Sequence, residues 1–354
     1  MTGEPLVSVI IPTYNCAAYL DESIRSVLAQ TYVTYEIIVV DDGSTDNTRT
    51  VLAPFWDRIH YVHQENRELS AARNTGIREA RGDLIAFLDA DDVWLPTKLE
   101  LQVQTLQGQP AAGWAFADFL DFDDSGVTGG SRFSTWPGVR EWFDRHRVGD
   151  GGIACGPMYV DLLKANWIHA SSVMVRRNVL AVVGLFDEAC RVGEDYDLWL
   201  RIAQRYPVLC LGGVLTGYRF RPQSMSGPTE ARGVFTHQGR LMVLKKHLRN
   251  GSIPRALEGV VYRELSHHCW GLGWTLFGQN RFAEARKYFR QGICYQPLHG
   301  QLWMYWWGSF LPMTIIELVR RFRQWRRSYR LPSELAARNL SLTHSGPKGP
   351  RRTI

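Results

Sequence analysis

Residues 7–15 read Val-Ser-Val-Ile-Ile-Pro-Thr-Tyr-Asn, and residues 36–46 read Glu-Ile-Ile-Val-Val-Asp-Asp-Gly-Ser-Thr-Asp; together with the segment between them they decide the fold. Each segment contains an apolar run of strand length and then becomes polar. Between them, apolar residues recur from Leu20 to Leu28 at the spacing of one helix face. A strand, a helix and a second buried strand predict a βαβ unit in a parallel sheet that is covered on both faces.

The same alternation continues to residue 92. Residues 46–52 predict a second helix, residues 59–62 a third short strand, residues 70–80 a third helix and residues 84–88 a fourth buried strand. Ligands of open α/β sheets bind at the carboxyl ends of the strands, so the polar residues that follow the strands should converge on one crevice. These polar clusters are residues 13–15, 41–43 and 89–92.

The rest of the chain is less regular. Residues 171–175 predict a strand, residues 198–203 a helix, and residues 208–211 and 214–218 two short strands. Beyond about Gly233 the pattern is helical throughout. The sequence therefore predicts an α/β fold with a largely parallel central sheet and an all-helical C-terminal extension.

The helical part contains one recognisable unit. Trp270–Pro297 has the residue pattern of a single tetratricopeptide-type hairpin, and one repeat predicts a helical pair packed on the main domain. The neighbouring His267 and His268 lie outside the polar clusters, and we expect them in the core or on the surface. The expected division is a catalytic domain at 1–232, a helical extension at 233–330 and a basic disordered tail at 331–354.

Composition narrows the class of protein. The 354 residues are 45% apolar and 21% charged, as in a folded globular chain. The six cysteines show no CxxC spacing, which argues against a zinc site or disulfide framework and is typical of a reducing cytosol. The net charge of +6 is unevenly distributed, because ten Lys or Arg and one Glu lie from Arg320 onward. A basic tail on a mildly acidic body predicts contact with a polyanion.

The acidic residues at the strand ends have two interpretations. Asp46 and Asn47 are placed to cap the second helix, which is the ordinary role of such residues. Asp89 and Asp91 differ, because two carboxylates one residue apart repel each other unless a cation lies between them. Mg²⁺ or Mn²⁺ is typically held by one or two carboxylates and substrate phosphates, so this pair predicts a metal site.

Several motifs together resemble family 2 glycosyltransferases of the GT-A fold. The two segments quoted above carry the resemblance, as do Ser-Ala-Ala-Arg-Asn-Thr-Gly at 70–76 and Gly-Asp-Leu-Ile-Ala-Phe-Leu-Asp-Ala-Asp-Asp at 82–92. Residues 193–201, Gly-Glu-Asp-Tyr-Asp-Leu-Trp-Leu-Arg, are similar to the acceptor-side motif of that family. The resemblance implies an inverting, metal-dependent transfer of a sugar from a nucleotide-diphosphate donor, with a UDP-sugar favoured.

The resemblance also implies the role of each site residue. Thr13 and Tyr14 would flank the nucleoside base, and Asp41 would accept its N–H. Asp89 would reach the ribose and share the metal with Asp91. The implied donor-binding set is Pro12, Thr13, Tyr14, Asp41, Asp42, Arg73, Asp89, Arg219 and Arg221.

On the acceptor side, the resemblance implies that Asp195 is the general base. A sugar hydroxyl is a poor nucleophile, so a base must take its proton as the new bond forms. Glu194 and Trp167 would bind the acceptor. Asp197 is a weaker rival for the base, and the alternative role of Asp195 is to cap the helix that follows it.

The segment after the last strand departs from the family pattern. Many relatives have Tyr-Arg-x-His there, with the His near the metal, whereas this chain reads Tyr218-Arg219-Phe220-Arg221. Arginine cannot ligate a cation but binds phosphate oxygens through two N–H groups. We therefore expect Arg221 to contact the diphosphate, and we expect no His ligand to the metal.

The C-terminal segment predicts contact with a membrane surface. Leu302–Ile316 contains no charged residue, includes three Trp, and is followed by the arginines from Arg320 to Arg330. Fifteen residues are fewer than the roughly 20 that a spanning helix needs, so the segment should lie in the headgroup region of an anionic membrane. A helix packed on the catalytic domain is the alternative.

The expected partners are a nucleotide-diphospho-sugar, a glycan or lipid-linked acceptor and the cytoplasmic face of a membrane, with no nucleic acid. A nucleotidyltransferase is a rival, but Pro12-Thr13-Tyr14-Asn15 is not the Gly-rich basic loop that it needs. A dehydrogenase is excluded because no GxGxxG follows the first strand. The other rival is a nucleotide-sugar-binding scaffold without turnover.

Overall fold

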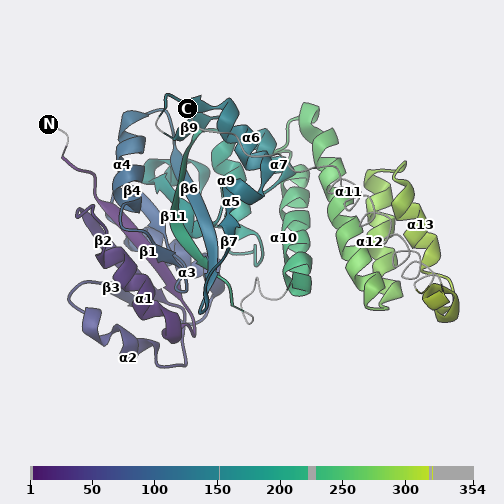
Figure 1. Ribbon diagram of the computed structural model, residues 1–354, viewed down its shortest axis with the longest axis horizontal. Helices are drawn as coiled ribbons and strands as arrows, with labels where there is room; N and C mark the ends of the chain where they lie inside the picture. The colour runs from purple at the N-terminus through teal and green to yellow at the C-terminus, as the bar shows by residue number, and fades with distance from the viewer. Residues whose placement is uncertain (1–2, 151, 222–228, 319–320, 322–354) are drawn as a thin grey trace, which may run out of the picture.

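The computed structural model describes residues 3–150, 152–221, 229–318 and 321. For residues 229–232 it describes the backbone only. A mixed sheet with helices on both faces forms the larger part of the molecule (Figure 1). A row of helices extends from one side of it and ends far from the sheet (Figure 1). The predicted α/β class with a helical C-terminal region is confirmed.

Four parallel strands form the part of the sheet that the first ninety residues predict. In spatial order they are β3 (His60–His63), β2 (Tyr35–Asp41), β1 (Val7–Thr13) and β4 (Leu84–Phe87). The β1–β2 register sets Thr13 opposite Asp41, so both polar clusters leave the sheet at one edge.

The second half of the sheet contains one strand of opposite direction. β10 (Val173–Arg176) pairs antiparallel with β4 on one side and with β6 (Trp114–Asp123) on the other. β11 (Val208–Arg219) then runs parallel to β6. Because β10 runs backwards, the residues that precede it lie at the carboxyl end of β4.

β11 corrects one expectation. Two short strands were predicted at 208–211 and 214–218, but Val208–Arg219 is one strand with register shifts on both sides of Val214. Gly212 and Gly213 interrupt the apolar pattern without ending the pairing. The irregularity is a bulge in a continuous strand, which hydrophobic periodicity cannot distinguish from a loop.

Alternation along the strands builds a core on each face of the sheet. Val9 and Ile11 pack with α1 (Ala17–Leu28), α2 (Thr48–Leu52) and α4 (Lys98–Gly108). Ile10 packs on the opposite face with α3 (Glu68–Glu79), α8 (Arg177–Val183) and α9 (Glu194–Ala203). The remaining elements are η1 (Ala53–Phe55), β5 (Val93–Trp94), β7 (Gly126–Ser131), α5 (Arg132–Thr135), α6 (Pro137–Arg145), β8 (Arg147–Val148), β9 (Ile153–Gly156), α7 (Tyr159–Lys164) and η2 (Ala170–Ser172).

Gly76 sets how closely α3 approaches the sheet. A Cβ at this position would lie 2.4 Å from Ile10 Cγ2, which is closer than carbon atoms can approach. The close contact places Arg73, one turn earlier on α3, beside the carboxyl end of β4. The glycine of the 70–76 motif therefore serves the geometry of the site.

The helical extension comprises α10 (Thr229–Arg249), α11 (Arg255–Gly278), α12 (Phe282–Tyr295), α13 (Gly300–Gly308) and a short helical stretch at 313–318. α11 and α12 form the predicted helical pair. Gly273 permits their contact, because a Cβ there would lie 2.4 Å from the ring of Phe289. His268 is buried next to His237, with 2.8 Å between the two Nδ1 atoms, which agrees with the expected core position.

The proposed domain boundary at 232/233 falls inside α10, and the hydrophobic core continues across it. Leu241, Val243 and Leu244 of α10 belong to the same buried cluster as Trp199 of α9. The extension therefore packs directly on the helix that carries Asp195. The predicted tail at 331–354 lies outside the described residues, and the division into domains stays a prediction.

Candidate active site

The loops at the carboxyl ends of β1 and β2 are joined by hydrogen bonds. The Asn15 side-chain carbonyl accepts from the backbone N of Thr45 at 2.8 Å, and Asn15 N donates to Ser44 Oγ. Asn15 has a φ of 48°, a left-handed conformation that Asn tolerates better than most residues. These bonds hold Thr13 and Tyr14 opposite Asp41.

Asp41 lies at the bottom of this predicted base pocket. Its Oδ2 accepts from Tyr61 Oη at 2.8 Å and its Oδ1 accepts from Ser44 N at 2.9 Å. Burial and the neighbouring Asp41 raise the pKa of Tyr61 to about 12, so the phenol keeps its proton and donates. Each carboxylate oxygen can accept a second bond, so a nucleoside N–H remains an acceptable donor.

The other residues predicted to hold the base differ in how exposed their side chains are. Tyr14 is exposed, whereas Pro12 and Thr13 are buried, and the Thr13 hydroxyl has no partner. Asp42 accepts from Gln64 Nε2 at 2.6 Å and from Arg67 N at 2.9 Å, and its predicted contact with the donor stays a prediction. Asp42 therefore fixes the loop that leads into α3, and Tyr61 is a residue that sequence reasoning did not include.

Asp46 caps the second helix with its side chain, whereas Asn47 does not. Asp46 Oδ1 accepts from Thr48 N at 3.1 Å, as predicted, but the Asn47 side chain makes no capping bond. The other Asp46 oxygen accepts from Ala17 N at 3.0 Å and so links α2 to the start of α1. The prediction for the Asn47 side chain was wrong, because the first N–H of the helix, that of Thr48, is bound by Asp46.

Arg73 connects the two halves of the predicted site. Its Nη2 donates to Asp89 Oδ1 and its Nη1 donates to Glu194 Oε1, both at 2.7 Å. The guanidinium is only 2% exposed and lies against the ring of Phe186. Arg73 thus joins the end of β4 to α9, and its expected contact with the donor stays a prediction.

A cluster of carboxylates follows β4, as the sequence predicts. Burial and the neighbouring Asp92 raise the pKa of Asp91 to about 6. Burial would also raise the pKa of Asp89, but Arg73 holds it below its ordinary value. Arg221 Nη2 lies 2.6 Å from Asp91 Oδ2. Carboxylates that repel one another at the edge of a cleft fit a divalent cation such as Mg²⁺ or Mn²⁺.

His169 belongs to this cluster and was missed from the sequence. Its Nε2 lies 2.6 Å from Asp92 Oδ2, and the ligand atoms of Asp89, Asp92 and His169 lie within 4.8 Å of one another. From the sequence we expect no His ligand to the metal, and that expectation stays a prediction. His169 precedes β10, and only the antiparallel direction of that strand brings it to the carboxyl end of β4.

Asp92 and Arg219 support the cluster from behind. Asp92 is fully buried and accepts from Ser171 Oγ and from the backbone N of Arg219. The Arg219 side chain lies between the rings of Tyr19 and Phe122, and its Nε donates to the carbonyl of Asp91 at 2.9 Å. Arg219 thus holds the backbone of Asp91, and its predicted contact with the donor stays a prediction.

Asp195 lies in the first turn of α9, next to Glu194. The residue before that turn is Gly193, which has a φ of 77°. Gly193 rather than Asp195 is therefore the N-cap of the helix. Burial and the charge of Glu194 raise the pKa of Asp195 to about 7. A carboxyl that titrates near neutral pH is suited to general base catalysis.

The two other acceptor-side residues are less accessible. Glu194 is engaged by Arg73, as described above. Trp167 is largely buried, because a Cβ on Gly138 of α6 would lie 2.7 Å from its ring. Little of the Trp167 ring is available to stack on a sugar, and its acceptor role stays a prediction.

Asp197 holds a structural position. It is fully buried and accepts from Arg201 Nε, Lys246 Nζ and His247 Nε2 at 3.0, 2.6 and 3.0 Å. Burial would raise the pKa of Asp197, but the hydrogen bonds from His247 and Lys246 hold it well below its usual range. Since Lys246 and His247 belong to α10, Asp197 fastens α9 to the extension and is unsuited to be the base.

We expect Asp197→Ala to lower the free energy of unfolding by about 3–5 kcal/mol, because it removes a fully buried carboxylate that pairs with the partly buried Arg201 and Lys246. Urea unfolding followed by circular dichroism measures this change. The matched control is Asp21→Ala, which removes an exposed ion pair with Arg25 and should cost under about 1 kcal/mol. Equal midpoints for the two variants would contradict the structural role.

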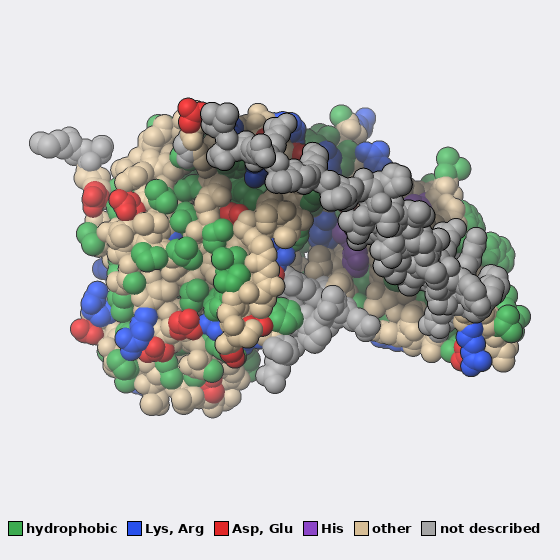
Figure 2. Space-filling model, viewed as in Figure 1, with side chains coloured by type: hydrophobic (Ala, Val, Ile, Leu, Met, Phe, Trp, Pro, Cys, Tyr) green, Lys and Arg blue, Asp and Glu red, His purple; other side chains and the backbone are tan. Residues whose placement is uncertain are grey.

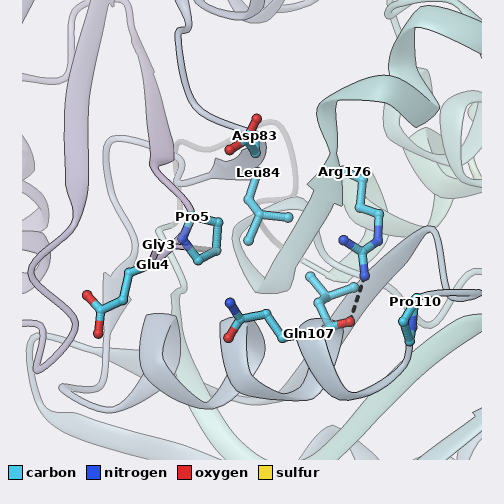
Figure 3. Close-up of a pocket in the computed structure, with 9 residues that line it drawn as sticks. Gly3, Glu4, Pro5, Asp83, Leu84, Gln107, Pro110 and Arg176 are labelled. Atoms are coloured by element: carbon cyan, nitrogen blue, oxygen red, sulfur yellow. Dashed lines mark hydrogen bonds between the residues drawn. The ribbon is translucent and has the colours of Figure 1, made fainter. Parts of the chain in front are cut away.

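A separate cavity of about 720 Å³ lies at the other end of the strands (Figure 3). It is lined by Asp83 and Leu84 at the start of β4, by the end of α4 and by Arg176, which donates to the carbonyl of Leu106 (Figure 3). None of the predicted site residues lines it. The carboxylates at the C-terminal ends of the strands, and not this cavity, form the candidate active site.

Solved structures share this architecture. The mannosyltransferase PcManGT of Pyrobaculum calidifontis, solved with GDP-Man and Mn²⁺, matches with a TM-score of 0.56 and 21% identity over 87% of this chain and 86% of that one. TarS 1–349 of S. aureus matches with a TM-score of 0.53 and 16% identity over 81% and 80%. At these identities the likeness defines the fold, which is the GT-A glycosyltransferase fold.

The sequence comparisons define the family. Residues 8–153 match the model of glycosyl transferase family 2. The chain is 47% identical over 225 residues to the Escherichia coli protein named UDP-Glc:alpha-D-GlcNAc-diphosphoundecaprenol beta-1,3-glucosyltransferase WfgD, covering 62% of this chain and 79% of that protein. This protein therefore belongs to glycosyl transferase family 2.

Other relatives are much longer. An uncharacterized glycosyltransferase of Rickettsia felis is 34% identical over 226 residues, which cover 63% of this chain and 35% of that protein. The chain thus spans about a third of the length of that relative.

Proposed function

We propose that this protein transfers a sugar from a UDP-sugar to a hydroxyl of a lipid-linked glycan, with inversion at the anomeric carbon and with Mg²⁺ or Mn²⁺ as the cofactor. One observation carries the proposal. Arg73 joins a carboxylate cluster suited to a cation to the helix turn in which the pKa of Asp195 is raised to about 7. A leaving-group site and a base are thereby held in one rigid arrangement.

The chain's own residues divide the chemistry as follows. Thr13, Tyr14 and Asp41 hold the nucleoside, and Arg221 contacts the diphosphate. Asp195 accepts the proton of the acceptor hydroxyl while the hydroxyl oxygen bonds to the anomeric carbon. The bond between that carbon and the diphosphate breaks at the same time. A cation held by Asp91 and Asp89 would neutralise charge on the leaving diphosphate. Attack opposite the leaving group inverts the anomeric centre, as in inverting hydrolases.

The donor and acceptor are proposed from the similarity to WfgD, whose name contains UDP-Glc and a diphosphoundecaprenol-linked GlcNAc. The first assay should pair radiolabelled UDP-glucose with a GlcNAc-diphospho-lipid in the presence of Mn²⁺. Product that forms with Mn²⁺ and disappears with a chelator supports the proposal. UDP-glucose binding without any single-turnover product, across a panel of acceptors, would favour the scaffold alternative.

The raised pKa of Asp195 predicts a pH dependence. The base must be deprotonated, so kcat/KM should fall as pH drops below about 7 and should approach a tenfold loss per pH unit. Asp91 has a lower pKa, about 6, and its protonation should weaken metal binding instead. Measuring UDP–Mn²⁺ affinity over the same range separates the two groups. A kcat/KM that stays constant between about pH 7 and pH 5 would contradict the assignment.

We also propose that the end of the extension contacts an anionic membrane on its cytoplasmic face. Leu302 and Ile316 are buried against α12, which leaves a surface of large apolar side chains facing outward. Hydrophobic side chains are visible at this end of the molecule in Figure 2. This surface comprises Trp303, Met304, Trp307, Phe310, Leu311, Ile315 and Leu318.

The charge of the C-terminal segment favours a lipid partner for this surface. The arginines predicted to meet the membrane follow the surface directly in the chain, although all of them except Arg321 lie outside the described residues. Each basic residue near an anionic bilayer contributes roughly 1 kcal/mol. In the part of the chain that the structure describes, no helix combines the length and the hydrophobicity that crossing a bilayer requires.

Vesicle flotation tests the membrane proposal. Wild-type protein should float with anionic vesicles at low salt and be released by high salt, because electrostatic attraction is screened. Trp307→Ser should reduce flotation, since that ring is 62% exposed on the proposed surface. Trp56→Ser is the matched control, because Trp56 is exposed on the catalytic domain. Equal flotation on neutral and anionic vesicles, or equal loss in both variants, would refute this mode of attachment.

A further inference from the structure

Each carboxylate of the cluster after β4 is held by a different basic side chain. Asp89 is bound by Arg73 at 2.7 Å, Asp92 by His169 at 2.6 Å and Asp91 by Arg221 at 2.6 Å. Each of these three neighbouring carboxylates thus has a basic partner inside the protein before any cation binds. A divalent cation must therefore compete with one of these side chains.

Two of the three pairs are fixed by further contacts. Arg73 also binds Glu194 and packs on Phe186, as described above, and its guanidinium is nearly inaccessible. Asp92 is fully buried and accepts from Ser171 Oγ and the backbone N of Arg219 as well as from His169. Neither pair can open without breaking several buried hydrogen bonds.

The pair of Arg221 and Asp91 differs in exposure. The side chains of Arg221 and Asp91 are 26% and 17% exposed, so both groups reach solvent. Arg221 lies against the ring of Tyr19 on α1, with 5.0 Å between its guanidinium carbon and the ring centre. A long side chain with a guanidinium at the cleft surface can turn toward a bound phosphate while its stem keeps its place.

We propose that Arg221 is paired with Asp91 in the free enzyme and leaves this carboxylate to bind the diphosphate when the donor arrives. The cation and the nucleotide therefore bind together. Arg221 thereby acts as a gate on Asp91. The diphosphate attracts the guanidinium through paired N–H bonds, and the released carboxylate then has a cation as its new partner. This inference rests on the proposed function and adds an order of binding to it.

The exchange predicts weak binding of metal alone. If Arg221 occupies Asp91 in about nine molecules of ten, the apparent Kd for Mn²⁺ rises about tenfold. Because linkage is reciprocal, UDP should tighten Mn²⁺ binding by the same factor as Mn²⁺ tightens UDP binding. Arg221→Gln removes the competing charge and should bind Mn²⁺ alone about tenfold more tightly than wild type.

Electron paramagnetic resonance of free Mn²⁺, with the full-length chain and with or without UDP, measures these affinities without any turnover. Arg221→Lys keeps the positive charge and should stay close to wild type. Arg25→Gln also removes one positive charge, but from an exposed pair with Asp21, and should change nothing. A folded Arg221→Gln that binds Mn²⁺ alone no more tightly than wild type overturns the exchange. Failure of every protein to bind Mn²⁺, even with UDP, overturns the metal-dependent function itself.

Discussion

Asp195→Asn should lower the rate of sugar transfer by about 10²–10⁴-fold while leaving donor binding close to wild type. The amide is almost the same size as the carboxylate, but it cannot accept a proton at neutral pH. The fold should tolerate the change, because Asp195 accepts a hydrogen bond from the backbone N of its neighbour Tyr196, which an amide oxygen can also accept. Single-turnover transfer and UDP–Mn²⁺ titration on the same preparation measure the two quantities separately.

The control for this experiment is Glu194→Gln. Glu194 is held by Arg73, so its substitution should disturb the position of α9 and weaken binding and turnover together. Only the Asp195 variant should reduce turnover alone. If Asp195→Asn retains more than about a tenth of wild-type turnover, another group accepts the proton. Asp197 is a poor replacement, since its carboxylate is enclosed by Arg201, Lys246 and His247.

Asp91→Asn should abolish the metal dependence of donor binding. Asp91 is one of the few charges in the cleft that can face a cation, and an amide is a much weaker ligand for Mg²⁺ or Mn²⁺. The substitution also removes the carboxylate of Asp91 as a partner of Arg221, which should then contact the diphosphate without competition from Asp91. We therefore expect UDP to bind the variant with similar affinity in the presence and absence of Mn²⁺, while transfer is lost.

Isothermal titration of UDP with Mn²⁺ and with a chelator measures this difference. Asp83→Asn is a suitable control, because that carboxylate lies at the opposite end of β4, beside the cavity of Figure 3. The control should keep the full metal dependence of the wild type. An Asp91→Asn protein whose UDP affinity still rises with Mn²⁺ would remove Asp91 from the metal site, and the gate proposed for Arg221 would fall with it.

The first ninety residues were predictable because their signals are local. Buried runs and helical spacing identify β1, β2 and β4 and the helices between them, and parallel strands bring Thr13, Asp41 and Asp89 to one edge. The same reasoning failed for β11, where two glycines suggested a break. Pairing with β6 on one side and β9 on the other keeps that strand continuous, and those partners lie far away in the sequence.

The sequence by itself determined the fold class, the family and the identity of the carboxylates, because strand direction and motif spacing are properties of short segments. Tertiary structure alone decided what each group does. It brought His169 to Asp92 through an antiparallel strand and buried Arg73 between Asp89 and Glu194. It also bound the carboxylate of Asp197 to Lys246 of α10. Charges and pKa values depend on burial and on neighbours from distant segments, and no local pattern in a chain records them.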